Sequence, residues 1–155
     1  MEKIDSLNQV AEFHRTFNAP ILETPQIPSK ERCELRVSLL QEELNELKQA
    51  IEDNDLVEIA DALCDLQYVL SGAVLEFGLG EKFVELFNEV QRSNMSKACD
   101  TELQAQETVE HYKAKGEEAF YEKSGNKFNV HRISDNKVLK NKYYSSANLK
   151  SILEK

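Results

Sequence analysis

The chain has 155 residues, of which 41% are hydrophobic and 30% are charged, and its formal net charge is −9. This composition is typical of a folded chain of about one domain and excludes a disordered one. The acidic balance argues against a nucleic-acid partner, because phosphate backbones select basic surfaces.

No segment of the sequence predicts a membrane partner or an oxidising compartment. The longest uncharged run, 66–75, is too short to cross a bilayer, and the N-terminal residues have no leader pattern. The three cysteines are far apart without a CxxC pair, so they predict neither a zinc site nor a disulfide framework. We therefore expect a cytoplasmic protein.

Apolar periodicity predicts a helical body in the first three quarters of the chain. A first helix is expected over about 5–17, followed by a proline-containing loop. A second helix over about 30–52 begins after Ser29, a candidate N-cap. Its apolar residues alternate four and three apart in one continuous stripe. The members of this main apolar stripe are Cys33, Val37, Leu40, Leu44, Leu47 and Ile51.

The remaining helices follow from caps and glycines. A third helix over about 55–77 begins at Asp55 and ends at Gly78 or Gly80. A fourth covers about 81–93, and a fifth covers about 101–115 and ends at Gly116.

The character of the chain changes after Gly116. The segments FYEK, KFNVHR and KVLKNKYY are short, rich in aromatic and β-branched residues, and separated by SGN and SDN. This pattern predicts a small β-hairpin or meander, and SANLKSILEK then adds a helical turn. The predicted fold class is therefore all-α with a small C-terminal β appendage, divided into a helical domain, 1–116, and a small α+β extension, 117–155.

The segment 42–65, EELNELKQAIEDNDLVEIADALCD, contains nine carboxylates and one cation, Lys48. At about 100° per residue, part of the second helix forms another stripe beside the main one. This second stripe consists of Leu39, Glu43, Glu46 and Ala50. Two carboxylates therefore lie on a face that is otherwise apolar, whereas Glu52 and Asp53 are interpreted as ordinary solvated charges.

The third helix carries its polar residues in a sector of about 80°, opposite a broad apolar side. This sector contains Glu58, Asp61, Asp65, Tyr68 and Gly72. A helix this apolar is normally buried, so its carboxylates must face something other than bulk water.

Unpaired buried carboxylates cost several kcal/mol each, and the cations nearby are too few to neutralise them. Such groups either protonate or bind a hard divalent cation, which prefers oxygen ligands. Glu58 also occupies a capping-box position, but capping does not explain the acids one and two turns later. The ExxE and ExxD pairs on two antiparallel helices favour a metal site made of Glu43, Glu46, Glu58 and Asp61.

These motifs resemble a known superfamily. EELNE followed by EIAD, together with FHRTF and the downstream VQRSNMSK, is similar to the all-α nucleoside triphosphate pyrophosphohydrolases. That superfamily includes MazG, dimeric dUTPases, dCTP pyrophosphatase and phosphoribosyl-ATP pyrophosphohydrolase. The likeness covers residues 8–115. It implies a MazG-like helical bundle that forms a homodimer or homotetramer, and Mg²⁺-dependent cleavage of a nucleotide between its α- and β-phosphates.

The resemblance also implies roles for individual residues. The metal ligands for Mg²⁺, or Mn²⁺ in its place, would be Glu43, Glu46, Glu58 and Asp61. The catalytic residues would be Glu42 and Glu43, with Glu42 orienting or deprotonating the attacking water. The substrate-binding residues would be Asp65, Asn94, Lys97 and Arg36, although Arg36 has pairing with an acid as an equal alternative. His14 is expected in the core or at its rim.

Three features leave the function open at this point. The chain has no tryptophan to stack a base. Phosphoribosyl-ATP pyrophosphohydrolases typically have a histidine after the aspartate segment, as in DLLYH, whereas this chain has DLQYV. The leading hypothesis is hydrolysis of a deoxynucleoside or non-standard nucleoside triphosphate. The alternatives are phosphoribosyl-ATP pyrophosphohydrolase and a non-catalytic helical interaction protein. The basic segments after 116 either pack on a neighbouring subunit, contact a phosphate or cap a sheet.

Overall fold

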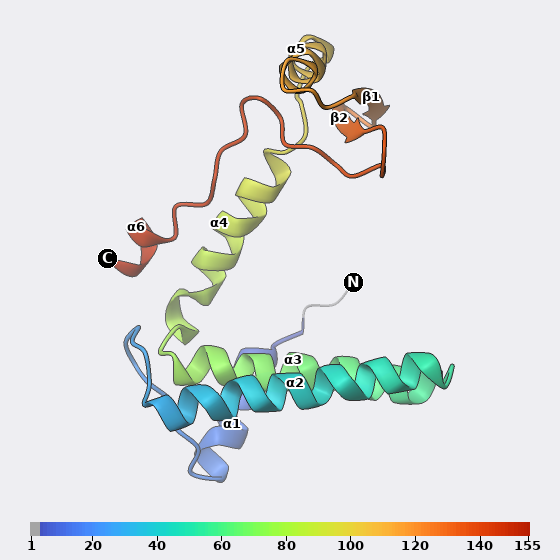
Figure 1. Ribbon diagram of the computed structural model, residues 1–155. Coiled ribbons are helices and arrows are strands. Elements are labelled where there is room, and N and C mark those ends of the chain that lie inside the picture. The colour runs from blue at the N-terminus through green and yellow to red at the C-terminus, as the bar shows by residue number, and fades with distance from the viewer. Residues whose placement is uncertain (1–3) are drawn as a thin grey trace. The chain divides into compact units, whose positions relative to one another are not determined.

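The computed structural model describes residues 4–155, in which helices predominate and one small sheet lies near the C-terminus (Figure 1). The all-α class with a β-hairpin appendage is confirmed. The chain divides into two compact units, 1–83 and 84–155, which are described separately below. The division predicted from the sequence, after residue 116, is a different one and stays a prediction.

The first unit is a long helical hairpin with a third helix against it. Helices α2 (Lys30–Glu52) and α3 (Leu56–Glu76) lie side by side, joined by a short turn at 53–55 (Figure 1). Helix α1 (Ser6–Thr16) packs on α3, and a 3₁₀ turn, η1 (Gly80–Lys82), follows α3.

Local sequence signals define the ends of this hairpin. The hydroxyl of Ser29 accepts a hydrogen bond at the start of α2, and the carboxylate of Asp55 accepts two at the start of α3. Gly78 ends α3 with a φ of +67°, and a Cβ there would lie 1.9 Å from the carbonyl oxygen of Thr24. Only glycine fits this position without displacing the backbone.

The main apolar stripe of α2 is only partly covered within one copy of the chain. Three members of that stripe, Val37, Leu44 and Ile51, are 68%, 50% and 58% exposed. The other three members of the stripe, Cys33, Leu40 and Leu47, are half-buried. The remaining residues that α2 buries or half-buries are Arg32, Arg36, Leu39, Glu43 and Ala50. Three members of the second stripe, Leu39, Glu43 and Ala50, are therefore covered, whereas Glu46 and the exposed half of the main stripe are not.

The second unit is built on α4 (Phe83–Met95) and α5 (Glu102–Lys113). Strands β1 (Ala119–Ser124) and β2 (Lys127–Arg132) form an antiparallel hairpin that packs on α5. Its buried core contains Cys99, Ala105, Val130 and Leu139.

The third β-like segment, KVLKNKYY, does not form a strand. It makes one isolated bridge, between Val138 and His131, so the sheet is a hairpin and not a meander. The chain then continues to a single helical turn, α6 (Lys150–Leu153). Among the described residues no single helix is both long and apolar enough to cross a membrane, and 56–76 with 80–95 passes only as a bent pair.

Candidate functional site

Glu43 is the centre of a carboxylate cluster on the α2–α3 hairpin. The pKa of its carboxyl group is raised, and burial is the largest cause. The negative charges of Glu46, Asp65, Glu42 and Asp61 raise the pKa further. One of its oxygens, Oε2, is buried and has no hydrogen-bond partner. An ionised oxygen in this position is destabilised both by lost hydration and by like charge.

The hairpin geometry explains why these acids meet. Asn54 occupies the turn with a φ of +54°, and residues equally distant from it lie opposite one another. Glu43 and Asp65 are each eleven residues from Asn54, and Glu46 and Asp61 are eight and seven residues from it. Helical spacing then places Glu42 beside them.

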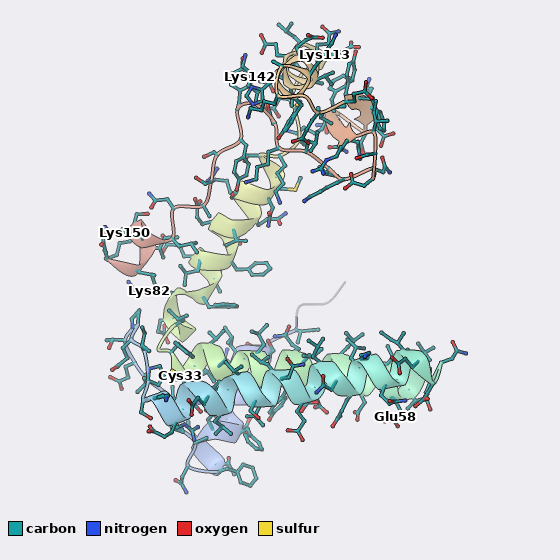
Figure 2. The ribbon with its side chains drawn as sticks, in the orientation of Figure 1. Cys33, Glu58, Lys82, Lys113, Lys142 and Lys150 are labelled. Atoms are coloured by element: carbon teal, nitrogen blue, oxygen red, sulfur yellow. The ribbon has the colours of Figure 1, made fainter. Side chains whose placement is uncertain are left out.

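Glu58 lies one helical turn before Asp61, on the side of the cluster that is away from Glu43. It is in the first turn of α3, where its backbone N–H donates to Asp55 Oδ1 at 3.2 Å (Figure 2). It precedes Asp65 by seven residues, which is about 10 Å along a helix, and its charge is not among those that raise the pKa of Glu43. The Asp55 N–H donates to the carbonyl of Ala50, so the reciprocal half of a capping box is not formed by Glu58. Its role as a metal ligand stays a prediction.

The cluster has the donor chemistry of a hard-cation site. Every side chain in it offers only oxygen, the net charge is negative, and one buried oxygen is unsatisfied. Across residues 4–155, no three carboxylates, imidazoles or thiols already converge enough to enclose an ion. Glu46 and Asp61 are exposed and can rotate, so a cation would draw together carboxylates that otherwise repel each other.

A buried ion cluster joins the other end of the hairpin. Glu76 is 1% exposed and accepts hydrogen bonds from Arg36 and from Arg32, whose Nε lies 3.0 Å from Oε2. Burial alone would raise the pKa of Glu76, but the two arginines outweigh it and lower the pKa. Of the two roles expected for Arg36, the structure shows the pairing with an acid, and contact with substrate stays a prediction.

Sequence reasoning missed Arg32 and Glu76, although the hairpin register contains them. Both residues are 22 positions from Asn54, on opposite sides of it, so an antiparallel hairpin places them face to face. Arg36 and Gly72 are likewise 18 positions from Asn54. An added Cβ at Gly72 would lie 2.7 Å from Arg36 Nη1, so the glycine leaves room for the guanidinium.

His14 belongs to the core of the first unit, as predicted. It is buried, and its Nδ1 lies 2.8 Å from the carbonyl oxygen of Pro20. Its Nε2 would be 3.0 Å from a Cβ added at Gly72. The ring therefore fixes α1 and the following loop against α3.

Asn94 and Lys97 form a pair in the second unit. Lys97 Nζ donates to Asn94 Oδ1 at 2.8 Å; Asn94 is in the last turn of α4 and Lys97 is in the turn that follows the helix. Sequence reasoning predicted both as substrate-binding, and the structure brings them together in one polar group. Their contact with a substrate stays a prediction.

Comparison with known protein families shows the family of this chain. A family model described as phosphoribosyl-ATP pyrophosphohydrolase matches residues 10–94, more than half of the chain. This chain belongs to the phosphoribosyl-ATP pyrophosphohydrolase family. The family is part of the MazG-like all-α nucleoside triphosphate pyrophosphohydrolases, so the predicted superfamily is confirmed. Membership indicates a pyrophosphohydrolase that acts on nucleotide-like substrates.

A second comparison extends the likeness beyond the matched region. An uncharacterized protein of Acanthamoeba polyphaga mimivirus is 25% identical in a match that spans 99% of the present chain and 97% of that protein. The similarity therefore includes α5, the β-hairpin and the C-terminal residues, which lie outside the family match.

Proposed function

We propose that this member of the phosphoribosyl-ATP pyrophosphohydrolase family hydrolyses a nucleoside triphosphate between its α- and β-phosphates, giving a monophosphate and pyrophosphate, with Mg²⁺ as cofactor. The observation that supports this most is the environment of Glu43, a half-buried carboxyl group with an unpartnered oxygen among four other carboxylates. Such a group is destabilising in a metal-free protein and becomes favourable beside a divalent cation.

The acids of the cluster and Glu58 have separate roles in this proposal. Glu43, Glu46 and Asp61 hold the cation, with Glu58 as the outlying fourth ligand. Bound Mg²⁺, or Mn²⁺ in its place, would neutralise phosphate charge and activate a water. Glu42 adjoins the cluster on the exposed side of α2 and orients or deprotonates that water.

Substrate identity has two candidates. The first is a deoxynucleoside or non-standard nucleoside triphosphate, in which case Asp65 contacts the nucleotide or supports a metal ligand. The second is phosphoribosyl-ATP, which the description of the matching family favours. Growth of a histidine auxotroph that lacks this step, restored by the present chain, would select the second, and failure to restore growth would count against it.

We also propose that the protein acts as a homodimer or homotetramer. Besides the main stripe of α2, the exposed apolar residues of α3 include Leu56, Val57, Leu63 and Leu70. Apolar surface of this extent on one hairpin is typical of a protein–protein interface. A second copy of the chain is the occupant that the proposal favours, since a self-complementary hairpin face makes a symmetric contact.

The test is pyrophosphate release from a panel of nucleoside triphosphates and phosphoribosyl-ATP, with and without Mg²⁺. We expect Mg²⁺-dependent turnover that Glu46→Ala and Asp61→Ala each abolish. Glu52→Ala is the matched control, because Glu52 is exposed and only faces Lys48 at 3.8 Å. No turnover of any nucleotide by micromolar protein would refute the proposal and favour a non-catalytic helical interaction protein.

A further inference from the structure

Three aromatic side chains form an exposed cluster on α1 and α3, within the first unit. The ring centroid of Phe13 lies 4.4 Å from that of Phe17, on the same helix, and 5.6 Å from that of Tyr68 on α3. Phe13, Phe17 and Tyr68 are 41%, 65% and 39% exposed, so each ring keeps a surface that a ligand can reach. Exposed apolar surface gathered in one place is typical of a binding site.

Tyr68 belongs to the polar sector of α3 that carries the acids. It follows Asp65 by three residues and Asp61 by seven, which is about one turn and two turns of the helix. Side chains at these spacings lie on the same face of a helix. Between Asp65 and Glu76 the sequence has no charged residue. Along one face, α3 therefore changes from carboxylates near the turn at 53–55 to an aromatic ring without charges beside it on the helix.

Phe13 orients the ring of Tyr68. The two rings meet at an interplanar angle of 85°, the edge-to-face arrangement that aromatic pairs prefer. The buried residues Val10, Ala11 and Leu75 fix α1 against α3, so the contact between the rings is part of a packed structure. The exposed surface of Tyr68 is therefore presented in one orientation, which lowers the entropy cost of binding a flat ligand.

A nucleotide has the same order of polarity as this face of α3. Its phosphates require the cation that the carboxylates would hold, whereas its base is flat and stacks on aromatic rings. The sugar and the α-phosphate separate the base from the cleaved bond by roughly seven single bonds, at most about 10 Å. Tyr68 also lies about 10 Å along the helix from Asp61, since each residue adds about 1.5 Å. A nucleotide whose cleaved bond lies at the cation can therefore reach Tyr68 with its base.

We propose that Tyr68 stacks on the base of the nucleotide substrate and that Phe13 is its positioning residue. The aromatic cluster is then the nucleoside end of the site, and the phosphates extend from it towards Glu58 and the turn at 53–55. This inference rests on the proposed pyrophosphohydrolase function and assigns the direction in which the substrate lies on the hairpin. Because every base has a flat face, the ring contributes affinity for nucleotides without selecting one base.

The test compares ligands that have a base with a ligand that has none. Calorimetry in the presence of Mg²⁺ gives the dissociation constants of a panel of nucleoside monophosphates and of inorganic triphosphate. We expect Tyr68→Leu to raise the dissociation constants of the monophosphates by about 10-fold, as the loss of one stacked ring does, and to leave that of inorganic triphosphate unchanged. In turnover, KM should rise by a similar factor and kcat should change much less. Tyr68→Phe keeps the ring and should retain wild-type constants.

Two further substitutions separate positioning from general effects. Phe13→Leu should raise the dissociation constants of the monophosphates and Phe13→Tyr should not, because only the second keeps a ring against Tyr68. Tyr143→Leu is the matched control, since Tyr143 is an exposed tyrosine of the second unit and lies outside the family match, and it should leave every constant unchanged.

Three results would overturn the assignment of Tyr68. They are wild-type affinity for the monophosphates in Tyr68→Leu, an equal loss of affinity for inorganic triphosphate, and a smaller mass of this variant in light scattering, which would place the ring in an interface between copies. A wild-type protein that turns over no nucleotide would instead refute the proposed function, whereas the dissociation constants would still test the ring.

Discussion

Replacing Glu76 by glutamine should destabilise the first unit strongly. The side chain is almost fully buried and is the shared counter-ion of two guanidinium groups, one of which, on Arg36, is also buried. Glutamine keeps the shape but removes the charge, so the arginines would remain in a poorly hydrated position without a counter-ion. Breaking a buried pair in this way costs 3–5 kcal/mol, and because Arg32 is one third exposed and can regain water, we expect about 3 kcal/mol.

The assay is thermal unfolding followed by circular dichroism at one protein concentration. For a chain of this size, about 3 kcal/mol lowers Tm by about 6–12 °C. The control is Glu52→Gln, whose exposed pair with Lys48 should contribute less than about 0.5 kcal/mol. A Tm loss in Glu76→Gln no larger than that of the control would refute the reasoning.

The pH dependence gives the same prediction a second readout. The pKa of Glu76 is lowered from 4.5 in the folded protein, so its stabilisation is fully present above that value. As the pH falls below 4.5, through the folded-state pKa, the carboxylate is protonated and the stabilisation is lost. The difference in stability between wild type and Glu76→Gln should therefore be constant near neutral pH and shrink in acid.

Three further predictions follow from other positions. Glu43→Gln should raise Tm without metal, because it removes like-charge repulsion, and should lose the stabilisation that millimolar Mg²⁺ gives wild type; equal Mg²⁺ shifts in a thermal-shift assay would contradict this. Gly78→Ala should cost at least about 2 kcal/mol in urea unfolding, since its Cβ would collide with the Thr24 carbonyl. Leu44→Lys should reduce the mass measured by light scattering, because it places a charge in the proposed interface between copies. Leu103→Lys on α5 is the control, since Leu103 is also an exposed leucine, and it should leave the mass unchanged. A monomeric wild type would contradict the oligomer proposal.

Much of the hairpin could be predicted from local signals. Ser29 and Asp55 were identifiable as caps, and Gly78 as the stop of α3, because each supplies a hydrogen bond or a backbone conformation that a helix end requires. The convergence of Glu43 and Asp61 also followed from helical periodicity and a short turn.

Apolar periodicity did not predict which face of α2 is covered by α3 within one copy of the chain. The main stripe of α2 contains more apolar residues than the face that packs on α3, yet Val37 and Leu44 are exposed. Helical spacing reveals that an apolar face exists, but the hairpin register, counted outward from Asn54, determines its partner. The same register places Glu58 nearer the turn than Glu43 and pairs Arg32 with Glu76.

The C-terminal arm, residues 137–146, was harder to predict because its structure is not periodic. KVLKNKYY has the composition of a strand, but it pairs with β2 only briefly, through the N–H of Leu139 and the carbonyl of Lys137. Beyond this point its backbone bonds to Lys97, after the end of α4, and to Thr108. The decisive residue is Asn141, whose amide contacts depend on residues more than 30 positions away. Such contacts leave no signal in a single sequence.

The most direct measurement is divalent-cation binding to the hairpin, followed by electron paramagnetic resonance of Mn²⁺ with competition by Mg²⁺. We predict saturable Mn²⁺ binding to wild type that Mg²⁺ displaces, that Glu43→Gln and Asp61→Asn each lose, and that Glu52→Gln keeps. Equal binding by all four proteins, or none by wild type, would contradict a metal site at the α2–α3 carboxylates.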